Sequence, residues 1–277
     1  MRGATTAKSD VFAANRARGS IALGVGARGS VTRRLHVREA GSLRVRFPNC
    51  DVRELEAVIL NTAGGVAGGD QLTIEITVAE AARLTVTSAA AEKIYRSLGP
   101  DATIDVRLTV GAGCVLRWLP QEMILFDRAC VRRTIDIDLA ENATLVLAEA
   151  VFFGRSAMGE TLASGAFFDR WRLRRGGKLV FAETIRLDGD LARKLTQAAV
   201  AGGAQAVATV LVAPGDDSAV AAVRGLSEDF LGEVGISSWN GIAMARFCAQ
   251  DAARLRADMM TVLGAASGSA LPRLWLN

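Results

Sequence analysis

The sequence predicts a mainly β protein, in which helically wound, stacked strands form a β-solenoid-like scaffold that is followed by a few C-terminal helices. From residue 20 to about residue 190, short runs of alternating apolar and polar residues follow one another with short turns between them, which is typical of consecutive strands. A turn motif recurs in these runs about every 30 residues, and periods of that size indicate stacked repeats. Beyond this region the apolar spacing becomes helical. These three observations give the fold class.

The recurring turn ends in an apolar residue, which is Leu84, Val115, Leu145 or Leu179 in the four units. Each unit consists of an amphipathic strand, a short turn and a second apolar strand. Such a unit cannot bury its apolar face alone, so neighbouring units are expected to stack. An ordinary sandwich of hairpins is the alternative, because the last interval is longer than the others.

The chain is expected to form a single domain over residues 20–277, preceded by a flexible N-terminus over residues 1–19. Within the domain, residues 20–190 are β-rich and residues 191–277 mix strands with helices. Asp216 is placed to cap a helix that begins after it, and the spacing from Trp239 to Leu263 also predicts a helix.

Composition excludes several classes of protein. The 277 residues are 50% hydrophobic and contain one histidine, His36, and four cysteines without a C-x-x-C pair. Zinc sites, disulfide frameworks and most histidine-based hydrolase sites need more than this. The first thirty residues contain no continuous apolar run, and the longest apolar tract, residues 198–214, is broken by glycines and is too short to span a membrane. A cytoplasmic protein without a membrane partner is expected.

A glycine-rich turn extends from Asn61 to Asp70 and contains four glycines. A phosphate-binding loop would have Lys, and then Ser or Thr, where this turn has Asp70 and a strand pattern follows. Nucleotide binding is therefore not predicted. Two interpretations of Asp70 remain: it faces a cation, or it caps the backbone of its own turn.

Two further carboxylates follow the repeat. Glu149 and Glu183 each lie four residues after the apolar position of their unit. If the units are in register, these side chains lie on adjacent strands about 5 Å apart. They would then bind a cation, share a proton or pair with arginines. Such a pair would hold nickel loosely, because tight nickel sites use nitrogen and sulfur.

Two other functions are open at this point. Arg170, Arg172 and Arg174 share one face of a predicted strand and could meet a nucleic acid or an acidic protein. Ser156 follows a glycine in a pattern one residue away from a hydrolase nucleophile turn, with His36 as the one available imidazole base. Few aromatic residues accompany the arginines, and no helix pattern follows Ser156, so a nucleic-acid partner and a hydrolase are both disfavoured.

Five segments together resemble one family, the urease accessory protein UreD, also called UreH. These segments, in order along the chain, are residues 60–70, 87–97, 118–126, 148–160 and 169–183.

The resemblance implies a helically wound β scaffold and a maturation factor without catalytic or cofactor-binding residues. Such proteins join the accessory proteins UreF and UreG, a GTPase, on apo-urease and assist nickel delivery to its active site. Nickel would be a transient cargo, and Asp70, Glu149 and Glu183 are the candidates to line its route. Many relatives carry His and Pro where this chain has residues 61–63, so a nitrogen ligand is absent there.

Overall fold

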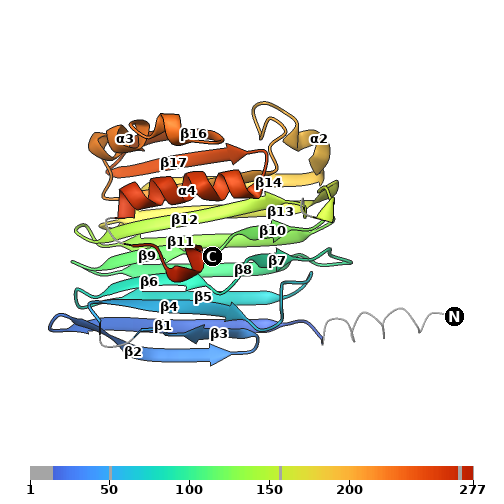
Figure 1. Ribbon diagram of the computed structural model, residues 1–277. Helices are drawn as coiled ribbons and strands as arrows, with labels where there is room; N and C mark the ends of the chain where they lie inside the picture. Colours follow the sequence, from blue (N-terminus) through green and yellow to red (C-terminus); the bar gives the residue numbers. More distant parts are fainter. Residues whose placement is uncertain (1–14, 50–51, 156–157, 268–269, 277) are drawn as a thin grey trace.

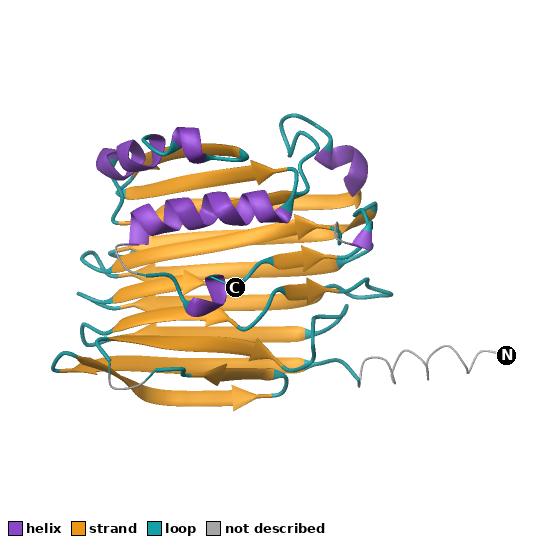
Figure 2. Cartoon of the chain, viewed as in Figure 1, coloured by secondary structure: helices purple, strands orange, loops and turns teal. Residues whose placement is uncertain are grey.

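Two β-sheets form the body of the molecule, and Figure 1 shows their strands stacked one above another. The computed structural model describes residues 15–49, 52–155, 158–267 and 270–276. The inward-facing apolar side chains of both sheets form one continuous core between them. Helices lie on the outer side of one sheet and at one end of the stack (Figure 2).

The seven-stranded sheet is called sheet A, and the ten-stranded sheet is called sheet B. Sheet A contains, in spatial order, β14 (Lys178–Asp190), β13 (Ser164–Arg175), β11 (Cys130–Leu139), β8 (Ala102–Val110), β5 (Gln71–Val78), β1 (Arg18–Arg28) and β2 (Val31–Ala40). Sheet B contains β16 (Glu233–Trp239), β17 (Ile242–Ala249), β15 (Ala206–Ala213), β12 (Thr144–Phe153), β9 (Val115–Leu119), β6 (Arg83–Ser88), β4 (Glu54–Asn61) and β3 (Leu43–Arg46), with β10 (Met123–Leu125) and β7 (Glu92–Ile94) beside them.

The central strands are wound as the repeat predicts. From β4 to β13 the chain passes repeatedly from one sheet to the other, and consecutive turns pair in parallel. Leu84 lies beside Leu116, and Leu116 beside Leu145. The predicted mainly β, stacked fold is therefore confirmed. The predicted repeat position in β9, Val115, is one residue away from Leu116, the residue that stacks. Every residue of β9 is buried, so the apolar pattern does not distinguish the two faces of this strand.

The fourth predicted unit is wrong. Leu179 lies on β14, which pairs antiparallel with β13 inside sheet A instead of continuing into sheet B. The reason is the turn between them: Gly176 and Gly177 both have positive φ, 54° and 80°. Two such residues form a tight hairpin within one sheet, whereas the turns of the other units connect a strand of sheet A to a strand of sheet B.

A third, short row of strands lies at one edge of the winding. Val66 bridges to Ile94, Ile94 pairs with Leu125, and Leu125 pairs with Phe153, always in parallel. These four residues come from the first four segments that carry the family resemblance. Segments far apart in the sequence therefore stack directly on one another.

The C-terminal region completes sheet B and covers it. The N-cap of α3 (Asp217–Arg224) is Asp216, as predicted. The helix predicted from Trp239 begins only with α4 (Ala252–Ser267), because residues 242–249 form β17. Helix α4 packs a second apolar core against the outer side of sheet B. A shorter helix, α2 (Leu191–Leu195), follows β14. No helix within the described ranges is long and apolar enough to cross a membrane.

Candidate functional site

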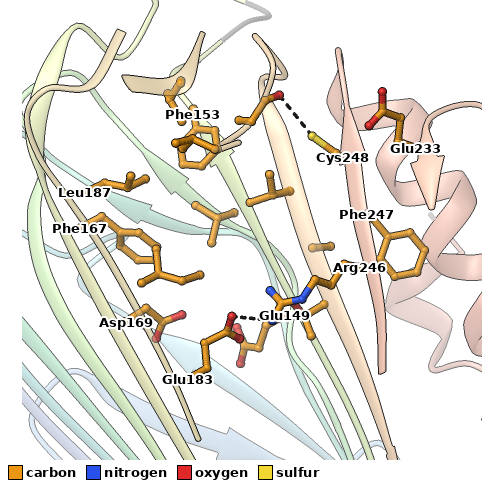
Figure 3. A pocket seen from close by; sticks show the side chains of 18 of the residues that line it. Glu149, Phe153, Phe167, Asp169, Glu183, Leu187, Glu233, Arg246, Phe247 and Cys248 are labelled. Carbon is orange, nitrogen blue, oxygen red and sulfur yellow. Dashed lines mark hydrogen bonds and ion pairs between the residues drawn. The ribbon is translucent and has the colours of Figure 1, made fainter. Parts of the chain in front are cut away.

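A cavity of about 650 Å³ opens between the two sheets at the end formed by β14 and β16 (Figure 3). Much of its wall is apolar and includes Phe153, Phe167 and Val207. Four carboxylates and two arginines also line it, which are Glu149, Asp169, Glu183, Glu233, Arg133 and Arg246. We call this space the acidic cavity, because its carboxylates outnumber its cations.

An arginine at the floor of the acidic cavity is shared by two carboxylates. Arg133 and Asp169 are register partners on the parallel strands β11 and β13. Their side chains form a two-pronged ion pair, with Nε–Oδ1 and Nη2–Oδ2 distances of 2.9 and 2.6 Å. Glu149 reaches the remaining Nη1 of Arg133 from sheet B. The floor thus links the two sheets through one guanidinium.

Two tryptophans complete the hydrogen bonds of this floor. Trp118 Nε1 donates to Glu149 Oε1 at 2.7 Å, and Trp171 Nε1 donates to Asp169 Oδ2 at 2.9 Å. The guanidinium carbon of Arg133 also lies 6.0 Å from the centre of the Trp171 ring. These donors orient the carboxylates.

The floor carries one carboxylate more than it has cations. Glu149, Asp169 and Arg133 are all at least nine-tenths buried, and an uncompensated charge in such a place costs several kcal/mol. Burial raises the pKa of Glu149 more than Arg133 and Trp118 lower it. Burial alone would lower the pKa of Arg133, but the two carboxylates outweigh it and raise that pKa. The arginine therefore stays charged, and the floor favours an additional proton or an additional cation at Glu149.

Glu183 and Arg246 form a second ion pair nearer to solvent. Arg246 Nη2 lies 2.5 Å from Glu183 Oε1, and the two side chains are 48% and 18% exposed, respectively. Figure 3 shows Glu183 beside the floor carboxylates, with Arg246 reaching it from the opposite wall. Glu183 is thus close to the floor network while its partner remains open to exchange with water.

The predicted adjacency of Glu149 and Glu183 is wrong, although both line the acidic cavity. Glu149 on β12 lies opposite Thr209, and Glu183 on β14 lies opposite Trp171, in different sheets. The glycine hairpin between β13 and β14 is the cause. The two carboxylates approach from facing sheets, not from neighbouring strands.

Asp70 lies elsewhere and caps its own turn. Its Oδ1 accepts from the Ala17 backbone N–H at 2.8 Å and its Oδ2 from the Ala67 N–H at 2.7 Å. Asp70 is buried but does not line the acidic cavity. Beside the same turn, Asn61 Nδ2 donates to Glu92. Burial, with a smaller contribution from Asp70, raises the pKa of Glu92 to about 7.

The comparisons with known proteins agree with the order of motifs. The family model for the UreD urease accessory protein matches residues 17–276. A urease accessory protein UreD of Bradyrhizobium diazoefficiens is 60% identical over the full length of both chains. One from Rhodopseudomonas palustris strain HaA2 is 62% identical over 99% of this chain and 98% of its own.

The chain belongs to the UreD family. It is accordingly an accessory protein and not an enzyme. Ser156, the candidate nucleophile, lies outside the described residues. His36, its one possible base, lies on β2, with its ring packed against Gly24 of β1.

The arginine stripe of this UreD-family chain, which consists of Arg170, Arg172 and Arg174, is largely engaged within sheet A. Arg170 pairs with Asp136 at 3.4 Å, and Arg172 Nη1 donates to the backbone carbonyls of Trp171 and Glu183. Arg174 is exposed and lies beside Asp138 on the neighbouring strand. Alternating charges on the same face reduce the attraction of the stripe for a polyanion.

The sequence interpretation missed Arg133 and Asp169, which hold the floor together. A signal for both exists in the alternation of their strands. Arg133 is in phase with the buried Val131 and Ile135, and Asp169 is in phase with Phe167. A charged residue at an apolar position of a strand faces the core and needs a partner there.

Proposed function

We propose that this chain is a urease maturation scaffold, which assembles with UreF and the GTPase UreG on apo-urease and helps to pass nickel to its active site. Membership of the UreD family supports the maturation role. Within the proposal, nucleotide hydrolysis belongs to UreG, which fits the absence of a phosphate-loop motif in this sequence. The proposed assembly works in the cytoplasm.

One observation carries the nickel part of the proposal: a single buried arginine faces two buried carboxylates at the floor of the acidic cavity. A divalent cation that reaches Glu149 would neutralise the excess negative charge of this floor. Because Arg133 already compensates Asp169 through two hydrogen bonds, Glu149 is the carboxylate that can exchange partners. Glu183 would meet the ion first, by releasing Arg246 to water.

The donor set suits a cargo ion that must leave again. Within the described part of the chain, no three His, Cys, Asp or Glu side chains are grouped so that they could hold a metal ion. Carboxylate oxygens bind nickel less tightly than imidazole or thiolate groups do. We therefore propose transient contacts at Glu149 and Glu183. We leave Asp70 out of the route, because both of its oxygens accept backbone hydrogen bonds.

Co-expression tests the scaffold role directly. The chain carrying an affinity tag is produced with UreF, UreG and apo-urease, and the purified complex is analysed for each partner. We expect UreF to be retained, and UreG and apo-urease to be recruited with it. If the folded chain retains none of the three, the maturation-scaffold proposal is wrong. Since this assay does not involve the carboxylates, it is independent of the nickel route.

Two conservative variants address the route. Glu149→Gln and Glu183→Gln keep the size of each side chain and remove its charge, so the complex should form while urease activation falls. Truncation to alanine is less informative at Glu149, because it would leave Trp118 Nε1 and Arg133 Nη1 without these acceptors. Normal activation by both glutamine variants would assign the two carboxylates a structural role.

A further inference from the structure

The end of the stack opposite the acidic cavity is open and basic. Sheet A ends there with β2 and sheet B with β3, as the lower part of Figure 1 shows. A cavity of about 560 Å³ lies between these two edges, and three arginines and one glutamate line it: Arg33, Arg34, Arg46 and Glu39. We call this space the basic cavity. Its charge attracts anionic groups.

Strand β2 is an unusually exposed edge strand. It has ten residues, and eight of them, residues 33–40, are exposed. Leu35 and Val37 are among them, with 56% and 38% of their surfaces open to water. Strand β2 pairs with β1 on one side. On the other side of β2, the described residues form one backbone hydrogen bond with another part of the chain. It is donated by Thr32 N–H to the carbonyl of Val52. The outer edge of β2 thus presents backbone donors and acceptors that could pair with another strand.

The charges on β2 determine what kind of strand could pair with its outer edge. Three arginines, Arg33, Arg34 and Arg38, stand on β2 against one acid, Glu39. Arginines on an edge strand disfavour pairing with a second copy of the same strand. The N-terminal residues 1–14 of the chain carry two basic residues and one acid, so their charge also has the wrong sign. An acidic strand is complementary in charge.

We propose that the basic end of the stack docks an extended, acidic segment of a partner protein. The segment adds a strand to the outer edge of β2, and its alternate side chains place carboxylates in the basic cavity. Backbone pairing supplies affinity in this mode of recognition, and the cavity supplies selectivity for acidic side chains. The interface lies at the opposite end from the acidic cavity and does not depend on the proposed nickel route.

Two arginines are placed to receive those carboxylates. Arg34 stacks over the Phe47 ring, with its guanidinium carbon 4.9 Å from the ring centre, which orients the guanidinium without consuming its hydrogen bonds. Arg46 lies 3.1 Å from Glu39, and 62% of the Arg46 side chain is exposed. An incoming carboxylate can therefore replace Glu39 at Arg46. The released Glu39 keeps its hydrogen bond from the Val45 N–H.

The test uses three labelled peptides that match the ten residues of β2 in length. One alternates Glu with Thr, one alternates Lys with Thr, and one repeats the acidic sequence with N-methyl groups at every second residue. Binding to the full-length protein is measured by fluorescence polarisation at low and moderate salt, and hydrogen exchange locates the bound strand. We expect the acidic peptide to bind more weakly as salt rises, and to protect the amides of β2.

Variants assign the contact to the cavity. Arg34→Ala and Arg46→Ala should each weaken the acidic peptide about two- to fivefold, as expected for exposed ion pairs. Arg170→Ala, on the outer face of sheet A, is the matched control and should leave binding unchanged. The lysine and N-methylated peptides should not bind.

Four results would each overturn the proposal. Equal binding of the acidic and lysine peptides would show that charge does not select the segment. Equal binding of the N-methylated peptide, or protection confined to residues outside β2, would show that no strand is added. Tighter binding of a thymidine decanucleotide than of the acidic peptide would assign the basic end to nucleic acid instead of protein.

Discussion

The acidic and basic cavities lie at opposite ends of the core between the same two sheets, yet their charged groups are held in different ways. At the acidic end, Arg133 is buried between Glu149 and Asp169, and each group fixes the others. At the basic end, Arg34 and Arg46 lie on exposed edge strands and face water. The first arrangement positions a charge that must be compensated inside the protein. The second leaves charges exposed to water, where a partner can reach them.

The difference follows from the position of each residue in its strand. Arg133 occupies an inward position of the central strand β11, where neighbouring strands on both sides exclude water. Arg34 belongs to β2, which has a neighbouring strand on one side. The same residue type is therefore a structural cation in one strand and a surface charge in the other.

The largest effect is expected from breaking the buried network. Arg133→Met removes the shared cation and leaves Glu149 and Asp169 without a counter-charge, so the free energy of unfolding should fall by about 3–5 kcal/mol. Urea denaturation followed by circular dichroism measures it. A change below about 1 kcal/mol would mean that the two carboxylates are not ionised together, and that the floor lacks the excess charge described above.

A smaller effect is expected from changing Glu149 itself, and its size should depend on the replacement. Glu149→Ala leaves Trp118 Nε1 and an N–H of Arg133 without acceptors, and should cost about 2 kcal/mol. Glu149→Gln keeps an acceptor oxygen for one of the two donors, places an amide N–H against the other, and removes the excess charge, so its cost should be smaller, about 1 kcal/mol. Equal destabilisation by the two replacements, measured by urea denaturation, would contradict this charge assignment.

The pH dependence of stability separates the acids whose pKa values are raised from the exposed groups. The pKa of Glu92 is raised from 4.5 to about 7, so between these pH values the folded state binds more protons than the unfolded state. Glu92 therefore stabilises the folded state most below pH 4.5, and this stabilisation decreases as the pH rises to about 7. Glu149 contributes with the same sign. Glu92→Gln and Glu149→Gln should each remove part of this decrease in urea denaturation across the pH range. Profiles parallel to that of the wild type would contradict the raised pKa values.

The smallest effect is expected at the basic end. Arg34→Ala and Arg46→Ala remove exposed charges, and should change the free energy of unfolding by no more than about 0.5 kcal/mol. Their melting temperatures, measured by differential scanning calorimetry, should match that of the wild type. A large loss of stability at either position would show that the basic cavity is part of the folded core rather than a surface for a partner.

Much of the fold follows from the sequence, because a winding of parallel strands repeats its apolar pattern. The positions of Leu84 and Leu145 in that winding were predicted. The hairpin at Gly176 and Gly177 was missed, because the apolar pattern recurs in the same way after a corner and after a hairpin, although two adjacent glycines favour a tight hairpin. The strand over residues 242–249 was taken for a helix, since its apolar residues are consecutive and fit either period.

The candidate site was predicted less completely than the fold. Glu149 and Glu183 stood out because each is an acid at the end of an apolar run, and both line the acidic cavity. Arg133 and Asp169 did not stand out, because their partners are supplied by strands distant in sequence. Asp70 was placed in the same group, but its oxygens accept backbone hydrogen bonds from Ala67 in its own turn and from Ala17 in the segment before β1. Which acid meets which cation depends on strand order, and the local sequence pattern does not give that order.

The nickel content of urease tests the central claim most directly. Urease is co-produced with UreF, UreG and the wild-type chain, or with Glu149→Gln, or with Glu75→Gln as the matched control. Glu75 pairs with Arg107 on the outer face of sheet A, where both side chains are exposed. Metal analysis of urease from equal amounts of complex should give less nickel per active site with Glu149→Gln and normal loading with Glu75→Gln. Equal loading with all three chains would contradict a nickel route through the acidic cavity.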